Sequence, residues 1–366
     1  MDTSDPEIVF NEEGICDFCQ NFNLKISKIW NPDRQDPILL KKLVNKIKAE
    51  SRNKKYDCVI GLSGGVDSSY LTYIAKEKLG LRPLALMVDT GWNLNVGNEN
   101  IHKIIQKLNI DLETIVVNWK EMKDLQLSFF KSQVPYQDTP QDHAIFAGLY
   151  NYAAKKGIKY VLTGANFSTE GVKPPQEWTY LNDLTFIKDI HKKFGNINLK
   201  TFPFCGIFKY KLYYRYVKGM KVIHLLNYID YKKEKAINTL KENFDWIEYK
   251  NKHYENIFTR FFEGYWLPKK FGYDKRRIYL SNLVITNQLT REEALTEISK
   301  QPYNDKLVKQ DMEYICSKLD INTDYFISLM NGQNKTYKDF KNNSILIKFA
   351  IRIAMKLGLE NRNFRV

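Results

Sequence analysis

The residues best equipped for chemistry lie between Ser63 and Ser69, in the stretch S-G-G-V-D-S-S. Three hydroxyls, two glycines and one carboxylate fall within these seven residues, and core packing gives no reason for that combination. The preceding run, 56–62, is apolar and β-branched like a buried strand, and helical periodicity begins at Ser68. A strand that turns through glycines into a helix gathers unpaired N–H groups and the positive end of a helix dipole, which suits a phosphate.

This loop is not a Walker loop, because G-x-x-x-x-G-K-[ST] would place a lysine where this chain has Asp67. An ordinary strand-to-helix glycine turn is the alternative, and the density of polar groups disfavours it. The loop resembles the pyrophosphate loop of the N-type ATP pyrophosphatases, which include GMP and NAD synthetases and tRNA-modifying enzymes. The resemblance implies cleavage of ATP to AMP and pyrophosphate, with AMP activating an oxygen for displacement.

The segments that must position this loop alternate between strand and helix. Strand patterns cover 56–62, 84–88, 114–117 and 160–163, with amphipathic helices expected at 36–50, 68–79, 101–108 and 144–156 and a loop at 129–143. This spacing predicts an α/β fold with a parallel sheet and helices on both faces. Beyond about residue 200 the alternation stops and the pattern is mostly helical. We expect an N-terminal segment at 1–35, a PP-loop ATP pyrophosphatase domain at 36–200 and a mostly helical substrate or partner region at 201–366.

Ligands of parallel sheets bind beyond the carboxyl ends of the strands, so the residues that follow neighbouring strands should share one crevice. The turn after 84–88 begins V-D-T-G-W, and the strand 160–163 ends in G-A-N. The residues expected to bind ATP and pyrophosphate are Gly61, Leu62, Ser63, Gly64, Gly65, Val66, Asp67, Ser68, Ser69, Val88, Asp89, Thr90, Gly164 and Asn166.

A block between residues 252 and 277 interleaves basic and aromatic residues, as K-H-Y-E, F-T-R-F-F and P-K-K-F-G-Y-D-K-R-R. Such a pattern fits single-stranded nucleic acid, a pocket for a phosphorylated small molecule, or a solvated helix face. The aromatic density indicates partial burial and disfavours the last of these.

Together with the loop, V-D-T-G-W, N-W-K-E-M-K-D-L-Q at 118–126 and D-H-A-I at 142–145, this block resembles the N-acetyl sugar amidotransferases of lipopolysaccharide and surface-glycan biosynthesis. The resemblance implies that ammonia from a partner glutaminase converts an acetamido group of a sugar, which we expect to be nucleotide-linked, into an acetamidino group. The cofactors implied are ATP and Mg²⁺, with Asp67 positioning the metal. The residues expected in catalysis are Asp67, Ser63, Lys270, Lys275 and Arg276. Those expected at the substrate are His143, Glu170, Lys252, His253, Glu255, Arg260, Lys269 and Arg277.

Cys16 and Cys19 form one C-x-x-C pair, which is half of a tetrahedral zinc site. The resemblance implies a second pair upstream of the position of Met1, so either the start is truncated or the metal site is reduced. Zn²⁺ is therefore a further candidate cofactor, and we expect weak or no zinc binding unless two more ligands are supplied. Two unliganded cysteines in a loop are the alternative.

The composition limits the kinds of partner that this protein is expected to have. The net charge of +14 favours acidic partners, but the lysines are scattered and give little evidence for RNA. Neither a membrane-spanning run nor a secretory signal is expected, and ATP chemistry implies the cytoplasm. No cysteine has the surroundings of a glutaminase nucleophile, and Cys205 is interpreted as structural, so a separate glutaminase is expected. The rivals are a PP-loop tRNA-modifying enzyme, by thiolation or lysidine-type ligation, and a catalytically inert scaffold.

Overall fold

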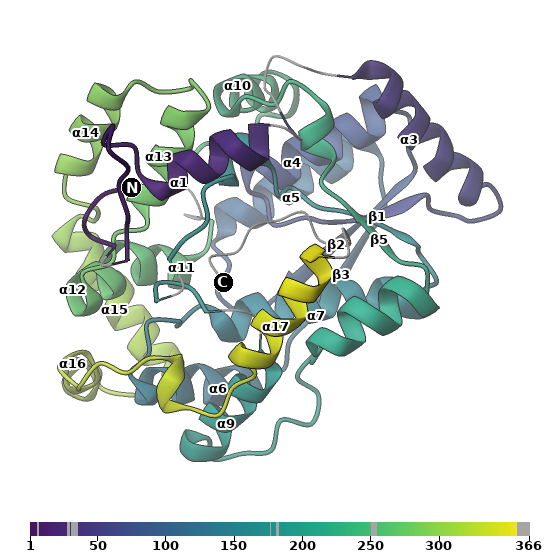
Figure 1. Ribbon diagram of the computed structural model, residues 1–366. Helices are drawn as coiled ribbons and strands as arrows, with labels where there is room; N and C mark the ends of the chain where they lie inside the picture. Colours follow the sequence, from purple (N-terminus) through teal and green to yellow (C-terminus); the bar gives the residue numbers. More distant parts are fainter. Residues whose placement is uncertain are drawn as a thin grey trace.

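Five parallel strands pair in the order β3-β2-β1-β4-β5 and form the sheet around which the helices are arranged (Figure 1). The computed structural model describes residues 1–5, 7–27, 30, 36–175, 177–180, 183–249 and 255–356. The strands are β1 (Cys58–Gly61), β2 (Pro83–Asp89), β3 (Leu112–Val116), β4 (Tyr160–Leu162) and β5 (Lys221–Ile223). The inner strands β1, β2 and β4 are mostly buried, as is typical of strands covered on both faces, whereas the edge strands β3 and β5 are partly exposed.

The chain changes direction across this sheet at β1. From β1 it passes through β2 to β3, and it then returns to place β4 on the other side of β1. The carboxyl ends of β1 and β4 therefore lie at a topological switch point, where open α/β sheets bind ligands. The loop that begins at Ser63 follows β1 directly, and Gly164 follows β4.

Helices cover both faces of the sheet, as the sequence predicts. Alternate β1 residues face opposite sides: Cys58 and Ile60 share a core with Leu71 and Ile104, whereas Val59 packs with Ala147. This is the two-residue period of a strand. The helical elements of this part of the chain are α1 (Asp17–Asn21), η1 (Phe22–Ile26), α3 (Pro37–Glu50), α4 (Val66–Tyr73), η2 (Ile74–Lys78), α5 (Asn95–Leu108), α6 (Trp119–Ser132), α7 (Thr139–Lys155), α8 (Phe167–Glu170) and α9 (Leu184–Phe194).

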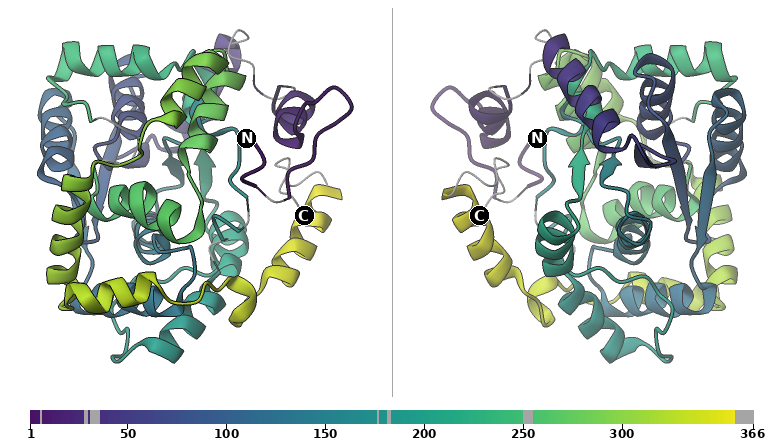
Figure 2. Two further views of the ribbon diagram at one scale, coloured as in Figure 1. Left: turned by 90° about the vertical axis from the view of Figure 1, so that its left-hand side faces the viewer. Right: turned by 90° about the vertical axis from the view of Figure 1, so that its right-hand side faces the viewer.

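The C-terminal helices share an aromatic core with the first half of the chain. Trp92 and Phe130 pack with Phe258, Trp266 and Phe326, and the ring centroids of Phe130 and Trp266 are 4.7 Å apart. Figure 1 shows most of the green and yellow-green helices on the left, beside the strands, and Figure 2 shows them from two further directions. The helical elements are η3 (Lys209–Val217), η4 (Leu225–Tyr228), α10 (Lys233–Phe244), α11 (Ile257–Phe261), η5 (Phe262–Trp266), α12 (Leu267–Phe271), α13 (Arg276–Ile285), α14 (Arg291–Ser299), α15 (Asp305–Leu319), α16 (Thr323–Met330), η6 (Tyr337–Asp339) and α17 (Ser344–Lys356).

The structure corrects two local expectations. Most of 129–143 is helical and not a loop, because α6 continues to Ser132 and α7 already begins at Thr139, with Pro140 in its first turn. The sheet also takes β5 from beyond residue 200, in the region that was expected to be mostly helical. A three-residue edge strand leaves too short a pattern to detect.

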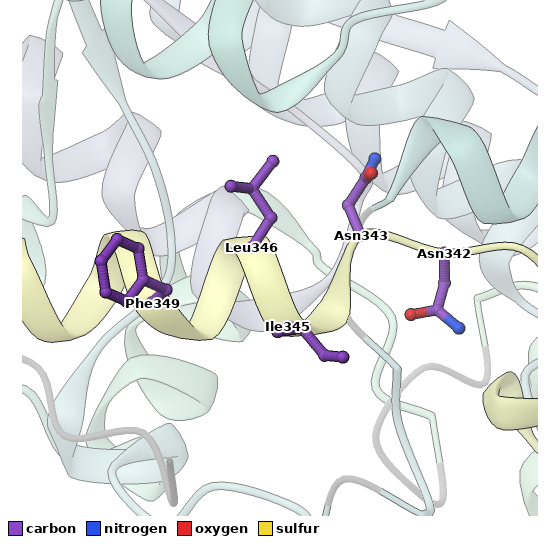
Figure 3. Close-up of a pocket in the computed structure, with 5 residues that line it drawn as sticks. All are labelled: Asn342, Asn343, Ile345, Leu346 and Phe349. Carbon is purple, nitrogen blue, oxygen red and sulfur yellow. The ribbon is translucent and has the colours of Figure 1, made fainter.

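The last helix, α17, lies at the surface. Ile345, Leu346 and Phe349 are exposed, and with Asn342 and Asn343 they line a hollow of about 400 Å³ (Figure 3). This lining contains no charged side chain, which makes it a poor setting for catalysis. Within the described part of the chain, no helix has the length and apolar character needed to cross a membrane.

Candidate functional site

The turn after β1 is shaped to present its backbone to an anion. Ser63 Oγ and Ser68 Oγ are 3.2 Å apart, the N–H of Gly65 donates to Ser63 Oγ at 3.2 Å, and Ser68 Oγ donates to the carbonyl of Gly65. Helix α4 starts at Val66 without a side-chain cap. Its first N–H groups and its positive dipole end are therefore directed at the space beyond the sheet.

Gly64 takes a left-handed backbone conformation, with φ of +82°, that a residue with a side chain rarely adopts. A Cβ there would also overlap the carbonyl oxygen of Gly97. From the other side, Trp246 Nε1 donates to the Gly64 carbonyl at 3.2 Å, and the hydroxyl of Tyr249 donates to the same oxygen. The loop is thus held by two aromatic side chains almost two hundred residues further along the chain.

Asp67 lies in the first turn of α4 and lines the cavity beside the loop. The Tyr231 hydroxyl donates to its carboxylate, and Asn166 Nδ2 approaches the same oxygen at 3.4 Å. A Cβ at Gly164 would lie 3.0 Å from the backbone nitrogen of Ser68 and 3.1 Å from Asp67, so the glycine after β4 allows a close approach to the start of α4. The burial of Tyr231 and the charge of Asp67 raise the pKa of Tyr231 well above its ordinary value, which keeps the hydroxyl protonated.

Beside the loop, the structure has a cavity of about 600 Å³ whose remaining lining is acidic. The loop contributes Ser63, Gly65, Val66, Asp67 and Ser68. The acidic wall is defined by Asp138 at the N-cap of α7, Asp142 of α7, Glu263 of η5 and Glu170, and Glu255 lies directly beside Gly65 of the loop. The lining holds seven carboxylates and three lysines, Lys173, Lys233 and Lys275, a formal balance of −4 in a protein that carries +14. Such a wall favours a cation.

Asp138 is the most perturbed carboxyl of this wall. It is buried and accepts hydrogen bonds from Gln141 Nε2 at 2.6 Å and from the Thr259 hydroxyl at 3.3 Å. Burial, reinforced by the nearby charge of Asp142, raises the pKa of Asp138 to about 8. A carboxyl with such a pKa can accept or donate a proton near neutral pH.

Lys275 stands against the same wall. Its ammonium group lies 3.0 Å from Glu263 Oε1, and Tyr279 donates to the same carboxylate at 3.1 Å. Burial lowers the pKa of Lys275, but the charges of Glu263 and Asp138 outweigh it, so the pKa is raised overall. Lys275 therefore keeps its positive charge and partly balances the acidic wall.

The structure brings only some of the sequence-predicted residues together. Those that line the cavity are Ser63, Gly65, Val66, Asp67, Ser68, Gly164, Glu170, Glu255 and Lys275. Gly64 and Asn166 support this lining from behind. Gly61, Leu62, Ser69, Val88, Asp89 and Thr90 are not among the described lining residues; Asp89 instead accepts from the N–H of Gly91 at 2.8 Å, and Ser69 is buried in α4.

Most described basic residues of the block 252–277 do not line the cavity. Arg260 pairs with Asp311 at 2.6 Å, Arg276 with Asp274 at 2.7 Å, and Arg277 with Asp2. Lys270 donates to the carbonyls of Met330 and Gly332, and Lys269 is exposed. Arg260, Lys270 and Arg276 thus connect C-terminal helices to one another, and Arg277 connects them to the N-terminal segment. Lys252 and His253 fall outside the described residues.

His143 also lies away from the cavity. It is 1% exposed, its Nε2 accepts from the N–H of Cys205 at 3.3 Å, and its ring is parallel to that of Phe202. This environment is that of a packing residue. Burial raises the pKa of the Cys205 thiol to about 11, so this cysteine is a poor nucleophile.

The two candidate metal sites differ in how well their residues fit. Mg²⁺ is commonly bound by one or two carboxylates together with substrate phosphates, and Asp67 beside the anion loop meets that requirement. The sulfurs of Cys16 and Cys19 are 3.5 Å apart, and burial and the neighbouring thiol raise the pKa of Cys19 to about 11. Across the described ranges no three potential ligands gather, so two thiols alone do not complete a tetrahedral zinc site.

Family matches agree with this geometry. Residues 39–165, which contain the anion loop, match the NAD synthase family. Residues 255–355 match the family described as LPS biosynthesis protein WbpG-like, C-terminal domain. The chain joins a PP-loop domain of the NAD synthase type to a WbpG-like C-terminal domain. The cavity lies between these two matched regions, since its loop belongs to the first and Glu263, Lys275 and Tyr279 belong to the second.

Relatives of the PP-loop domain include ATP-dependent C–N ligases. A glutamine-hydrolyzing GMP synthase of Pyrobaculum aerophilum is 27% identical over 168 residues, 43% of this chain and 30% of that protein. A tRNA-specific 2-thiouridylase of Fusobacterium nucleatum is 30% identical over 119 residues, 31% of this chain and 34% of that protein. The chain thus spans about a third of the length of these relatives. The solved NH3-dependent NAD synthetase of Campylobacter jejuni aligns with a TM-score of 0.32 and 16% identity, covering 81% of this chain and 96% of that one.

Several residues around the PP-loop cavity were missed from the sequence. Asp138, Gln141 and Asp142 share one face of α7 at spacings of three and four, and this spacing close to a helix N-terminus could have revealed them. Trp246, Tyr249, Glu263 and Tyr279 come from distant segments and leave no local pattern. Only the folded chain brings them to the PP-loop.

Proposed function

We propose that this chain is an ATP-dependent amidotransferase that converts the acetamido group of an N-acetyl sugar, nucleotide-linked, into an acetamidino group. The observation that carries the proposal is the cavity itself, in which an anion-binding loop faces an acidic wall across about 600 Å³. The loop suits the phosphates of ATP, and the wall suits a cationic second substrate, ammonium. The WbpG-like domain supports a role in lipopolysaccharide biosynthesis.

The first step activates a poor leaving group. The acetamido oxygen attacks the α-phosphorus of ATP, the bond between the α-phosphorus and the bridging oxygen breaks, and pyrophosphate leaves. Ser63, Gly65, Ser68 and the start of α4 hold the β- and γ-phosphates. Mg²⁺ held by Asp67 would neutralise charge on these phosphates. Catalysis here is mainly positioning and charge stabilisation.

The second step uses the acidic wall. Asp142 attracts ammonium by its charge, and Asp138, which has a pKa near 8 and lines the cavity, takes one proton from it in its ionised form to give ammonia. Ammonia attacks the imidate carbon, the bond from that carbon to the AMP oxygen breaks, and the proton then lost from the attacking nitrogen leaves with AMP. Lys173 and Lys233 provide cations for the phosphates of a sugar nucleotide.

We propose a separate glutaminase as the source of ammonia. Ammonia in water is largely protonated near neutral pH and then lacks the lone pair needed for attack, so direct delivery has a physical purpose. The similar GMP synthase is a glutamine-hydrolyzing enzyme. None of the five cysteines lines the described cavity. Since the reaction consumes ATP, we propose that it takes place in the cytoplasm.

The second candidate is a PP-loop tRNA-modifying enzyme, favoured by the similarity to the 2-thiouridylase. That similarity covers only 31% of this chain and lies in the part that PP-loop enzymes share. The acidic wall disfavours a polyanion in the cavity, and no cysteine is there to relay sulfur. RNA binding with a steep salt dependence would favour this candidate.

The decisive experiment supplies purified protein with ATP and Mg²⁺ and compares acetamido sugar nucleotides with unmodified tRNA. We expect ammonium and a sugar nucleotide to give AMP, pyrophosphate and a product in which NH replaces the acetamido oxygen, detected by mass spectrometry. Glutamine alone should give little product until a glutaminase is added. Release of AMP with tRNA and not with any sugar would reject the proposal, and equal turnover with glutamine alone would reject the separate glutaminase.

A further inference from the structure

The helix η3 exposes an apolar stripe to solvent, far along the chain from the PP-loop. Phe208 just before it and Leu212, Tyr213, Tyr216 and Val217 within it are 44–70% exposed. Their spacing of four, five, eight and nine residues places them on one side of a π-helix, which has a little more than four residues per turn. In Figure 1 this is the teal-green helix on the right-hand side.

The opposite side of η3 is firmly packed, so the exposed stripe is not a core face that failed to dock. Tyr214 is buried and donates to Asn151 Oδ1 at 2.6 Å. Tyr210 packs against Phe146 and Tyr150 of α7 with ring centroids 4.9 and 4.8 Å apart. The helix is therefore fixed to the body of the protein with a second apolar side turned outward. Exposed apolar surface of this kind marks an interaction site.

The charges that flank this stripe are all positive. Lys209, Lys211, Arg215 and Lys218 belong to η3 or follow it directly, and each cationic group lies 5.4–5.7 Å from the centre of a tyrosine ring of the same segment. Between Asp189 and Asp230 the sequence contains no acidic residue. The neighbouring end of α7 adds Lys155 and Lys156. The acidic group placed nearby, Glu50, is paired with Lys221.

We propose that η3 docks this protein on an anionic lipid bilayer, with its axis in the plane of the interface and its apolar stripe turned toward the acyl chains. Three features favour a lipid surface over a protein partner: the tyrosines suit the headgroup level, the lysines can extend back to anionic headgroups, and the forty residues 190–229 lack any acidic side chain. The inference does not rest on the reaction proposed above.

Binding should depend on both parts of this surface. Each basic residue near an anionic bilayer should strengthen partitioning about fivefold, and this electrostatic part should weaken as salt shortens the Debye length. The apolar stripe should supply the part that resists salt. Vesicles without anionic lipid should therefore bind much more weakly than vesicles that contain it.

The test is co-sedimentation of the purified full chain with vesicles of phosphatidylcholine alone or with about one third phosphatidylglycerol, a composition at which polybasic segments bind. The stripe variant Leu212→Ser/Tyr216→Ser and the charge variant Arg215→Glu/Lys218→Glu should each lower binding to anionic vesicles at least about tenfold. Matched controls on exposed positions elsewhere, Leu295→Ser/Tyr325→Ser and Lys306→Glu/Lys309→Glu, should bind like the unchanged protein. All these side chains are exposed, so melting temperatures should agree.

Other outcomes would overturn the inference. Failure to bind anionic vesicles, equal binding to neutral ones, or equal loss in stripe and control variants would each reject it. Light scattering would reveal a second copy as the occupant if the unchanged protein were a dimer, the stripe variant a monomer, and neither bound vesicles. Stoichiometric binding of a purified glutaminase that the stripe variant loses, again without vesicle binding, would assign the surface to that protein.

Discussion

The two walls of the cavity are built in different ways. The loop wall comes from one short stretch, 63–68, whose backbone is shaped by the left-handed conformation of Gly64 and which is proposed to bind phosphate through backbone N–H groups. The acidic wall comes from α7, α8 and η5, of which α7 and η5 lie more than a hundred residues apart, and it acts through side-chain charges that Lys275 partly balances. Substitutions that distort the backbone should therefore impair the loop wall, and substitutions that remove a charge should impair the acidic wall. The two effects can be measured separately.

The largest effect is expected at Asp67, which belongs to the loop but acts through the charge of its side chain. Asp67→Asn keeps the acceptor for the Tyr231 hydroxyl and the shape of the first turn of α4, but it removes the charge proposed to hold Mg²⁺. We expect pyrophosphate release to fall about 10²–10³-fold with little change in melting temperature. Asp111→Asn, on the surface at the start of β3, is the control. Near-normal turnover of Asp67→Asn would remove the loop from the proposed site.

At Gly64 we expect a loss of ATP affinity that comes from a change in backbone geometry alone. Gly64→Ala places a Cβ in a left-handed conformation and against the Gly97 carbonyl, so the loop must move. Gly272→Ala meets the same conformational cost, about 1–2 kcal/mol, with no atom within 4 Å of its new Cβ. We expect Gly64→Ala to lose about tenfold or more in the affinity for ATP, measured by titration calorimetry, and Gly272→Ala to lose only stability. Equal ATP affinity in both variants would show that the loop backbone does not contact the phosphates.

A charge effect confined to the second wall is expected at Asp142. Asp142→Asn should raise the ammonium concentration needed for half-maximal rate about tenfold, because one attractive charge is lost, and should leave the KM for ATP unchanged. Asp324→Asn on exposed α16 provides the same substitution away from the cavity. An equal rise in the KM for ATP and in the ammonium concentration needed for half-maximal rate would mean that the two walls do not act separately.

The smallest effect is expected in the pH dependence of stability. Because the pKa of Asp138 is raised to about 8 in the folded protein, this carboxyl binds its proton more tightly there than in the unfolded chain, where its ordinary value is 3.8. Its stabilising contribution is full below about pH 4 and is lost as the pH rises through 8. Asp138→Asn should remove this loss and raise the melting temperature at pH 8 by about 2–5 °C more than at pH 5. An equal change at both pH values would contradict the buried, protonated carboxyl.

The contrast between the two walls also explains how much could be predicted from the sequence alone. The loop, the helices on both faces and the first four strands could be predicted because each has its pattern within a short run. Gly164 could be placed because strand order brings two carboxyl ends together. Lys275 was predicted for its charge, but its chain neighbours Arg276 and Arg277 carry the same signal and turn to Asp274 and Asp2.

The residues that could not be predicted are those whose role depends on the side chains that contact them in the folded protein. His143 has the chemistry of a catalyst, but its packing against Phe202 and Cys205 is visible only in the fold. Glu263 has no pattern in sequence until Lys275 and Tyr279 surround it. Charge neutralisation across distant segments is a tertiary property, and composition does not encode it.

The aromatic core shared by the two halves has a consequence for how this protein is made. Trp92 and Phe130 leave the ribosome about 130–230 residues before Phe258 and Phe326, which at ~5–20 residues per second is a delay of several to tens of seconds. During that interval the nascent PP-loop domain has its ATP loop and most of its sheet but displays two large bare aromatic side chains. Translation of the remaining helices therefore completes the first domain as well as adding the second, and a chain that stops near residue 200 should need a chaperone to stay unaggregated.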